Sequence, residues 1–499
     1  MTALGTHELA GATAAHVAAL GQVLRGATAA GASLRLAVAN ESGHRTLRVA
    51  GPDAASVRAF EGDATEADGG VLLVGPLSPA NAAAVREHVP GLNPQPIGLD
   101  ASAGTGDRLG VSTAGQTRAW RSSGSGLVPV FAQQSIREMD RLGRTPQEVM
   151  DDATFGLLEA GWDRPVGSDA DHLHSIADID RCIPAGFTMF TLDPGDEVVA
   201  VAGVPSVAQL EAVPWAGLED SLDGMLARYA GLELDLGSES LALTPDEVRT
   251  AAVKYGGCVA LAAGMYRHLV ASVDHPFEVE FAIDETDYVT TIPEHAWLAL
   301  ELQRLGVDFV SFAPRYLGTF EKGVEYIGPL DALQRNLEAH AALAQQFGPY
   351  KISLHSGSDK FSIYPLAAAA TNRVVHLKTS GTTWLVAVDV AAHHAPDLFR
   401  EIYAVAREAY RNTSRNYHVS ADLAKTPEPD QLTDADLPGV VAAFDSRQLL
   451  HVGYGAVLRD HPRAPELSAA LKALLTLRAT EYGDFLEVHL GRHLAPFSA

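Results

Sequence analysis

Cysteine is nearly absent from this chain, which has only Cys182 and Cys258 among 499 residues. The two thiols lack metal-type spacing and cannot build a disulfide framework, so a reducing compartment fits. Long apolar runs are also missing, and no segment has enough uninterrupted apolar residues to span a bilayer. Residues 1–19 lack the basic region and long apolar run of an export signal. We therefore expect a soluble cytoplasmic protein.

Positive charge is scarce as well, because 37 Lys and Arg oppose 62 Asp and Glu, for a net charge of -25. This balance argues against binding to nucleic acid or to an anionic membrane, and an anionic substrate would need a local cationic pocket. The 47% hydrophobic content indicates a globular protein with a large core and room for an additional domain. A homo-oligomer is compatible with this composition.

The first 120 residues are rich in Ala, Gly and Thr and predict a small α/β region. The pattern predicts a helix over 9–30 and short strands over 34–39, 46–49 and 70–74. The glycines of Gly104-Thr105-Gly106 do not lie between a strand and a helix, as a dinucleotide-binding loop requires. We therefore predict no nucleotide site in residues 1–120.

From about residue 127 strands alternate with helical patterns, which predicts a (β/α)8 TIM barrel in residues 121–499. The eight predicted strands are 128–134, 164–170, 187–192, 277–283, 309–314, 351–355, 373–378 and 449–454. The connections after strands three and seven, 194–276 and 382–448, are long. We expect these insertions to carry extra helices or lids.

Polar side chains gather where the predicted strands end, whereas the strand starts are mostly apolar. A barrel of this kind carries its chemistry at the carboxyl ends of its strands. The residues concerned are Gln133 and Gln134 after strand one, Asp171 and His172 after strand two, Glu285 after strand four, Arg315 after strand five, His355 after strand six, and Lys378 and Thr379 after strand seven. This asymmetry predicts an active site at that end.

A metal site is one interpretation of Asp171-His172 and His355, since imidazoles and carboxylates suit zinc, manganese or nickel. Each histidine alone could equally be a hydrogen-bonded core residue. Their occurrence at corresponding strand ends favours the metal interpretation.

Two further strands place charged residues inside the predicted barrel. His376 and Lys378 share one strand face and should point inward, where an unpaired lysine is costly, so a functional role is favoured. His376 could be a metal ligand or a substrate donor. On strand four, Glu278, Glu280 and Asp284 face inward and could act as acid/base groups or ligands. The alternative for these carboxylates is a salt bridge to Lys378 or Arg315.

Several phrases of the chain together resemble the tagaturonate epimerase family, from about Gly106 to the C-terminus. They are PVFAQQSIRE (129–138), DADH (169–172), DETD (284–287), TTIPEH (290–295), APRY (313–316), FEKG (320–323), LHSGSDK (354–360), HLKT (376–379) and YHVSAD (417–422). The resemblance implies interconversion of tagaturonate and fructuronate in hexuronate catabolism, with a divalent metal ion.

A more distant similarity links Asp171-His172 and LHSGS (354–358) to class II ketose-bisphosphate aldolases. It implies that Asp171 is the acid/base group and that His172 and His355 bind the metal ion. This chain departs from those aldolases after strand five, where Ala313-Pro314-Arg315 replaces a further histidine ligand. Glu285 and His376 are the candidates for the third ligand.

The chemistry implied by these resemblances assigns a role to each candidate residue. The epimerised carbon, C4 of the ketose, is too far from the C2 carbonyl for simple enolisation, so retro-aldol cleavage and re-formation of C3–C4 is the hypothesis. The assignments are Asp171, Glu280 and Lys378 as catalytic residues, Gln133, Gln134, Arg315, Lys360 and Thr379 as substrate-binding residues, and His172, Glu285, His355 and His376 as metal ligands. Transient oxidation is the other route, but no dinucleotide fingerprint is visible. An aldolase or isomerase acting on a related sugar acid, and a non-catalytic sugar-acid sensor, are the alternative functions.

Overall fold

The computed structural model describes residues 25–29, 32–67, 70–237, 240–379, 381–417 and 419–499. Most of the helix predicted over 9–30 lies outside these residues, as does His418 of the YHVSAD phrase. Residues Arg25–Ala29, within that predicted helix, form strand β1 instead. Within the described residues no helix combines the length and the apolar character needed to cross a membrane.

Eight parallel strands form a closed barrel, which confirms the predicted (β/α)8 class. In chain order they are β6 (Ser102–Gly104), β7 (Val128–Ser135), β8 (Gly167–Leu173), β9 (Met189–Leu192), β12 (Glu278–Ala282), β13 (Ser311–Ala313), β14 (Lys351–Leu354) and β15 (Val375–Lys378). Each strand pairs with the next, and β15 closes the barrel on β6 through the pair His376 and Ser102.

The strand predicted over 449–454 is wrong, because these residues lie at the end of helix α16 (Phe444–Val452) and just beyond it. The missing barrel strand is β6, three buried residues within the stretch predicted as the N-terminal region. Helix α3 (Thr113–Ser123), which follows β6, also belongs to the barrel. The barrel therefore begins before residue 120, and a strand as short as β6 leaves no alternating pattern to detect.

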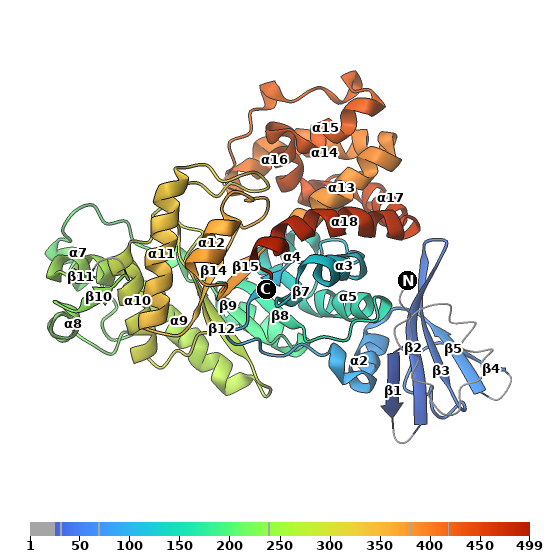
Figure 1. The fold of residues 1–499 in the computed structure, drawn as a ribbon, viewed down its shortest axis with the longest axis horizontal. Helices are drawn as coiled ribbons and strands as arrows, with labels where there is room; N and C mark the ends of the chain where they lie inside the picture. Colours follow the sequence, from blue (N-terminus) through green and yellow to red (C-terminus); the bar gives the residue numbers. More distant parts are fainter. Residues whose placement is uncertain (1–24, 30–31, 68–69, 238–239, 380, 418) are drawn as a thin grey trace.

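Two long connections carry additional elements, as predicted. The connection from β9 to β12 holds α7 (Val207–Glu211), α8 (Leu222–Tyr229), the hairpin β10 (Glu233–Asp235) and β11 (Ser240–Ala242), and α9 (Pro245–Ser272). The chain after β15 is helical and includes α13 (Thr382–His394), α14 (Pro396–Thr413), α15 (Leu437–Ala442), α16, α17 (Ala464–Leu477) and α18 (Ala479–Leu494). Figure 1 shows these last helices stacked beside the barrel, with α18 next to α3.

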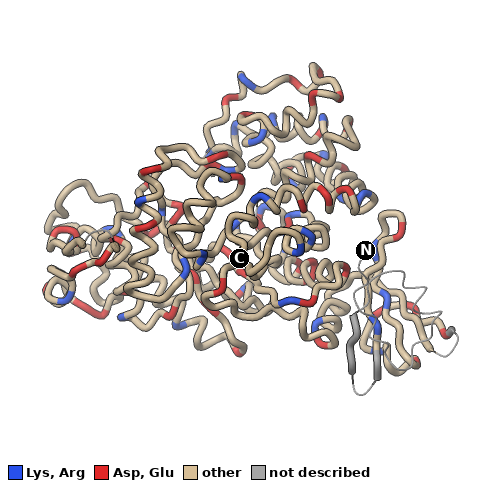
Figure 2. The backbone as a smooth tube through the Cα atoms, in the orientation of Figure 1, with Lys and Arg blue, Asp and Glu red and all other residues tan. Residues whose placement is uncertain are grey.

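The N-terminal sheet is antiparallel, with strand order β1-β2-β3-β5-β4. Its strands are β1, β2 (Ala32–Glu41), β3 (His44–Gly51), β4 (Asp63–Ala67) and β5 (Gly70–Gly75), followed by α2 (Pro79–His88). Strands β2, β3 and β5 contain the three strands predicted for this region. The sheet lies to one side of the barrel (Figure 1), and acidic residues are spread over all parts of the backbone (Figure 2).

The remaining helices follow barrel strands. They are α4 (Ile136–Leu142), α5 (Pro146–Glu159), α6 (Ile176–Cys182), α10 (Ile292–Arg304), α11 (Leu330–Gln346) and α12 (Tyr364–Ala370). Four of them, α4, α5, α6 and α10, begin at a side-chain cap. A threonine and a glutamate three residues later form capping boxes at α5 and α10, where each side chain bonds the other residue's backbone N–H. Such caps fix where a strand–helix connection ends and its helix begins, and the strand–helix connections carry the site described below.

Gly156 allows α5 to approach the start of α3, and this close contact is testable. A Cβ at Gly156 would lie 2.5 Å from Cβ of Thr113 and 2.9 Å from its Cγ2. Replacing Gly156 by Ala gains helix propensity but overpacks this contact, so we expect a net loss of about 1–2 kcal/mol in unfolding free energy. Urea denaturation measures the change.

Gly264 in α9 provides the matched control, because a Cβ there meets no atom within 4 Å. Gly264→Ala should raise the unfolding free energy by about 0.5–1 kcal/mol through helix propensity alone. Equal effects of the two substitutions would contradict the packing argument.

Candidate active site

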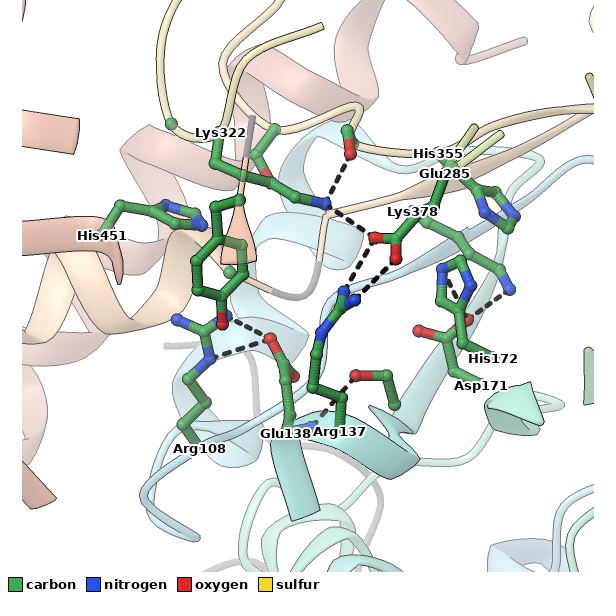
Figure 3. Close-up of a pocket in the computed structure, with 16 residues that line it drawn as sticks. Arg108, Arg137, Glu138, Asp171, His172, Glu285, Lys322, His355, Lys378 and His451 are labelled. Atoms are coloured by element: carbon green, nitrogen blue, oxygen red, sulfur yellow. Dashed lines mark hydrogen bonds and ion pairs between the residues drawn. The ribbon is translucent and has the colours of Figure 1, made fainter. Parts of the chain in front are cut away.

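A cavity of about 50 Å³ lies at the carboxyl ends of the barrel strands (Figure 3). Its wall combines residues from strand ends, the loops that follow them and the C-terminal helices. The lining residues are Arg108, Ser135, Arg137, Glu138, Asp171, His172, Glu285, Lys322, Gly323, His355, Ser356, Ser358, Lys378, Gly381, Tyr417 and His451. Five of the predicted site residues meet here: Asp171, His172, Glu285, His355 and Lys378.

Lys378 stands at the end of β15 with its ammonium group inside the barrel. Its Nζ lies 2.9 Å from Asp169, 2.7 Å from Asp171 and 2.8 Å from Glu280, and it donates a hydrogen bond to Thr191 at 2.6 Å. Burial alone would lower the pKa of Lys378, but the three carboxylates raise it well above its ordinary value. The inward-facing lysine predicted from strand parity is therefore charged and paired.

The two aspartates of β8 differ in their titration although both contact Lys378. Burial raises the pKa of Asp169, which also accepts hydrogen bonds from Gln133 at 3.1 Å and Thr191 at 2.8 Å. Burial also favours a higher pKa at Asp171, but the interactions of Asp171 with Lys378, His172 and His355 outweigh burial and lower the pKa of Asp171 to about 2. Asp171 lines the cavity in its ionised form and can act as a base there.

His172 is oriented by a carboxylate on the next strand. It adopts a left-handed backbone conformation, with φ of 52°, where its Nδ1 lies 2.7 Å from Oδ2 of Asp193. Because Asp193 occupies Nδ1, the other ring nitrogen, Nε2, is available to a ligand. A non-glycine residue in this conformation is strained, and such strain is often found at functional sites.

His355 follows β14 and is held between two carboxylates from β12 and its following loop. Its Nε2 lies 2.5 Å from Oε1 of Glu280, whose other oxygen accepts a hydrogen bond from Ser311. Its Nδ1 lies 2.7 Å from Oδ1 of Asp284, yet neither atom has a well-aligned hydrogen-bond partner among the described residues. The rings of His355 and His172 are nearly perpendicular, with centroids 4.9 Å apart.

These side chains form a group that fits a divalent metal ion. One ligand atom each from His172, Asp284 and His355 lies within 4.8 Å of the others. Two imidazole nitrogens and a carboxylate oxygen suit zinc, manganese or nickel. The buried Nδ1 of His355 and Oδ1 of Asp284, close together but unaligned for a hydrogen bond, are the atoms that a cation between them would satisfy.

The structure places Asp284 in this group, whereas the sequence pointed to Glu285 or His376 as the third ligand. Glu285 belongs to another group that could hold a metal ion, with His172 and Asp193, and Arg137 contacts both its oxygens at 2.7 and 2.8 Å. His376 is fully buried and absent from the cavity lining, with its Nδ1 2.8 Å from Oγ of Ser102. Glu280, predicted as catalytic, is also buried behind the lining and contacts Lys378 and His355 instead.

None of the five predicted substrate-binding residues lines this cavity. Gln133 bonds Asp169, the side-chain oxygen of Gln134 accepts from Arg144, and the hydroxyl of Thr379 donates to the Gly104 carbonyl. The side chains of these three residues thus form hydrogen bonds within the barrel wall. Their positions at strand ends did not indicate these partners.

The two predicted cationic clamps also lie elsewhere. The Nζ of Lys360 donates to the backbone carbonyls of Glu321, Val324 and Ser358, and burial lowers its pKa to about 7. Arg315 lines a separate cavity of about 30 Å³ beside Asp284. Lys360 therefore holds together loops around the site, and Arg315 lines a neighbouring cavity that also touches Asp284 and His355 of the metal-binding group.

Sequence reasoning missed the cationic side of the cavity. Arg108 lies in the stretch assigned to the N-terminal region, and Arg137 within the PVFAQQSIRE phrase was not singled out. Lys322 belongs to the FEKG phrase, and its Nζ lies 3.4 Å from Glu285 and 2.6 Å from Oγ of Ser356. His451, within the stretch predicted as strand eight (449–454), also lines the cavity, from helix α16.

Another, wider cavity of about 500 Å³ adjoins the first. The two cavities share Arg137, Glu285, Lys322 and Tyr417. The Arg137–Glu285 ion pair therefore contributes to the wall of both cavities.

Comparison with known proteins supports the resemblance found in the sequence. The family described as tagaturonate epimerase matches residues 28–497. A tagaturonate/fructuronate epimerase from Thermotoga maritima is 39% identical over 418 residues, which cover 83% of this chain and 84% of that protein.

Solved structures of a fructuronate-tagaturonate epimerase from Cohnella laeviribosi are similar to this chain throughout. A complex with one glycerol has a TM-score of 0.88 and 30% identity, covering 97% of this chain and 98% of that one. The native structure has a TM-score of 0.86 and 30% identity, with 96% of each chain covered.

Removing the Lys378 ammonium should destabilise the protein, because three buried carboxylates would lose their shared cation. Lys378→Met should lower the unfolding free energy at pH 7 by about 3–5 kcal/mol. Adding Asp169→Asn removes one of the carboxylates left without a cation, so the double variant should recover part of this loss. Urea denaturation of both variants measures the effect, and a double variant less stable than the sum of both single losses would contradict it.

The pH dependence of this loss follows from Asp171. Its pKa of about 2 lies below the ordinary 3.8, so the folded wild type loses this stabilisation as pH falls from about 4 to 2. In Lys378→Met the carboxylates should bind protons at a higher pH. The stability difference between variant and wild type should therefore shrink as pH is lowered from 7 towards 4, as measured by denaturation at several pH values.

Proposed function

The chain belongs to the tagaturonate epimerase family, and we propose that it interconverts D-tagaturonate and D-fructuronate by inverting C4 of the ketose. The observation that carries this proposal is the position of ionised Asp171 between the Lys378 ammonium and the group of His172, Asp284 and His355. An acid/base carboxylate is thus held next to a site that can bind a carbonyl-polarising cation.

The reaction needs more than proton transfer at carbon. C4 is two bonds from the C2 carbonyl, so its hydrogen is not acidified by that carbonyl. Cleavage of C3–C4 is available instead, because the electrons of that bond can pass to the carbonyl and form an enediolate. The products are dihydroxyacetone as its enediolate and a three-carbon aldehyde acid, and bond formation on the other face of the aldehyde gives the epimer.

Asp171 takes the proton from the C4 hydroxyl as C3–C4 breaks and returns it when the bond re-forms. Lys378 keeps Asp171 ionised before the reaction, because it contacts this carboxylate at 2.7 Å. Glu280 is a positioning residue, since it joins Lys378 to Nε2 of His355 without reaching the cavity. Asp193 orients His172 in the same manner.

We propose that His172, Asp284 and His355 hold the divalent ion on which the reaction depends. When bound, such an ion supplies Lewis-acid polarisation of the substrate carbonyl and stabilises the negative charge that develops there. The Nε2 of His172, opposite the nitrogen that Asp193 contacts, and the unaligned Nδ1 of His355 support this ligand set, as does the position of Asp284 beside His355.

Metal content tests the ligand assignment independently of activity. The protein as purified should carry about one divalent ion per chain, and a chelator should remove it together with epimerase activity. His355→Ala and Asp284→Asn should reduce bound metal at least tenfold by elemental analysis. His376→Ala serves as the control and should keep its metal, whereas metal loss in this variant alone would overturn the assignment.

Fragment trapping tests the retro-aldol route. With tagaturonate, an aldehyde reagent should capture the three-carbon aldehyde acid, and dihydroxyacetone should accumulate in parallel. Asp171→Asn should lower kcat by about 10²- to 10⁴-fold while metal content is unchanged, because only the acid/base step is removed. Absence of fragments under sensitive trapping, together with a bound nicotinamide, would favour transient oxidation. Net cleavage without an epimeric product would indicate an aldolase.

A further inference from the structure

Arg108 presents an unused donor to the active-site cavity. Its side chain is only 3% exposed, and its Nε donates to Oε1 of Glu138 at 3.1 Å. Its Nη2 contacts the same oxygen, and its guanidinium lies 3.8 Å from the ring centre of Tyr454. The remaining nitrogen, Nη1, is buried and has no hydrogen-bond partner among the described residues. Glu138 and Tyr454 thus fix a charged group whose third nitrogen stays available.

His451 contributes to the same wall. Its Nδ1 is also buried without a hydrogen-bond partner among the described residues. Burial lowers the pKa of His451 well below its ordinary value, and the charge of Arg108 adds to this shift, so the imidazole is neutral. A Cβ at Gly381 would lie 2.4 Å from Cε1 of His451 and 3.3 Å from Nη2 of Arg108. The two side chains therefore meet at Gly381, where no side chain separates them.

This wall lies away from the reacting groups. Figure 3 shows Arg108 and His451 on one side of the cavity, and His172, His355, Asp171 and Lys378 on the other. A ligand that engages the metal-binding group with one end can reach Arg108 only with its far end.

We propose that Arg108, through its Nη1, binds the substrate carboxylate at C6 and that His451 assists it. This inference rests on the proposed function, because it assigns the far end of the same substrate. It makes Arg108 the residue that selects uronates over neutral ketoses, which carry an alcohol at C6. A buried guanidinium nitrogen favours an anionic acceptor over a hydroxyl, since the hydrogen bond is then assisted by charge.

The anchor also explains how the proposed reaction can invert one centre without losing its intermediate. After C3–C4 cleavage, the carboxylate stays on the aldehyde fragment. With this carboxylate held by Arg108, the aldehyde carbon can turn its other face to the enediolate while the fragment remains bound. A weakened anchor should therefore release more of the three-carbon aldehyde acid.

Arg108→Met tests the anchor with two substrates that differ at C6. For tagaturonate, kcat/KM should fall about a hundredfold, because a hydrogen bond to a charged group is lost. For the neutral ketose tagatose, kcat/KM should change less than threefold. Arg118→Met is the matched control, since Arg118 pairs with Asp484 and Glu487 outside the cavity and should leave both substrates unaffected. Equal losses for both substrates, or no loss, would overturn the assignment.

Binding of fragment analogues gives a second readout that does not need turnover of tagatose. Titration calorimetry of the metal-loaded protein with D-glycerate should show at least tenfold weaker binding to Arg108→Met than to wild type. Dihydroxyacetone, which lacks the carboxylate, should bind both proteins within twofold. Glycerol 3-phosphate distinguishes a phosphate site, and a greater loss for it than for glycerate would overturn a carboxylate anchor.

The two proposals can fail separately. If wild type does not epimerise tagaturonate but Arg108→Met still loses glycerate selectively, the carboxylate site stands and the proposed reaction falls. If wild type epimerises tagaturonate and Arg108→Met binds glycerate normally, the reaction stands and the anchor falls.

Discussion

The ion cluster around Lys378 is the interaction on which the rest of the site depends. One ammonium group from β15 contacts two carboxylates from β8 and one from β12. In a buried location none of these charges is tolerable without the others, so the cluster ties strands from different parts of the barrel to one point. The two aspartates titrate differently within it, since Asp171 has a lowered pKa while that of Asp169 is raised.

Glu280 connects this cluster to the proposed metal-binding group. Its carboxylate contacts both Lys378 and the Nε2 of His355, and Ser311 holds its second oxygen. The orientation of the His355 ring is therefore coupled to the charge on Lys378. One hydrogen-bonded network thus links Asp171, the proposed acid/base group, to the proposed metal-binding group, and it draws on β8, β12, β13, β15 and the loop after β14.

The sequence was most informative where strand parity and chemistry agreed. The inward position of Lys378 follows from a period of two, and Asp171, His172 and His355 follow from their places at strand ends. Strand parity also predicted that Asp284 faces the barrel interior. The choice between Asp284 and Glu285 as the third proposed metal ligand depends on Arg137, which is distant in sequence and pairs with Glu285. The contacts of Gln133 and Lys360 could not be predicted for the same reason, because their partners come from other strands and loops.

Barrel closure has a consequence for the order in which this protein can mature. The last barrel strand, β15, pairs with the first, β6, across more than 270 residues, through His376 and Ser102. A chain emerging from the ribosome therefore contains Asp169, Asp171 and Glu280 long before Lys378, which among the described residues is the only lysine that contacts all three. Until residue 378 has been synthesised, these carboxylates lack the cation that pairs with them in the folded barrel. The charges inside the barrel are therefore balanced at the same late step that closes the barrel, and the protein cannot be catalytically active before that step.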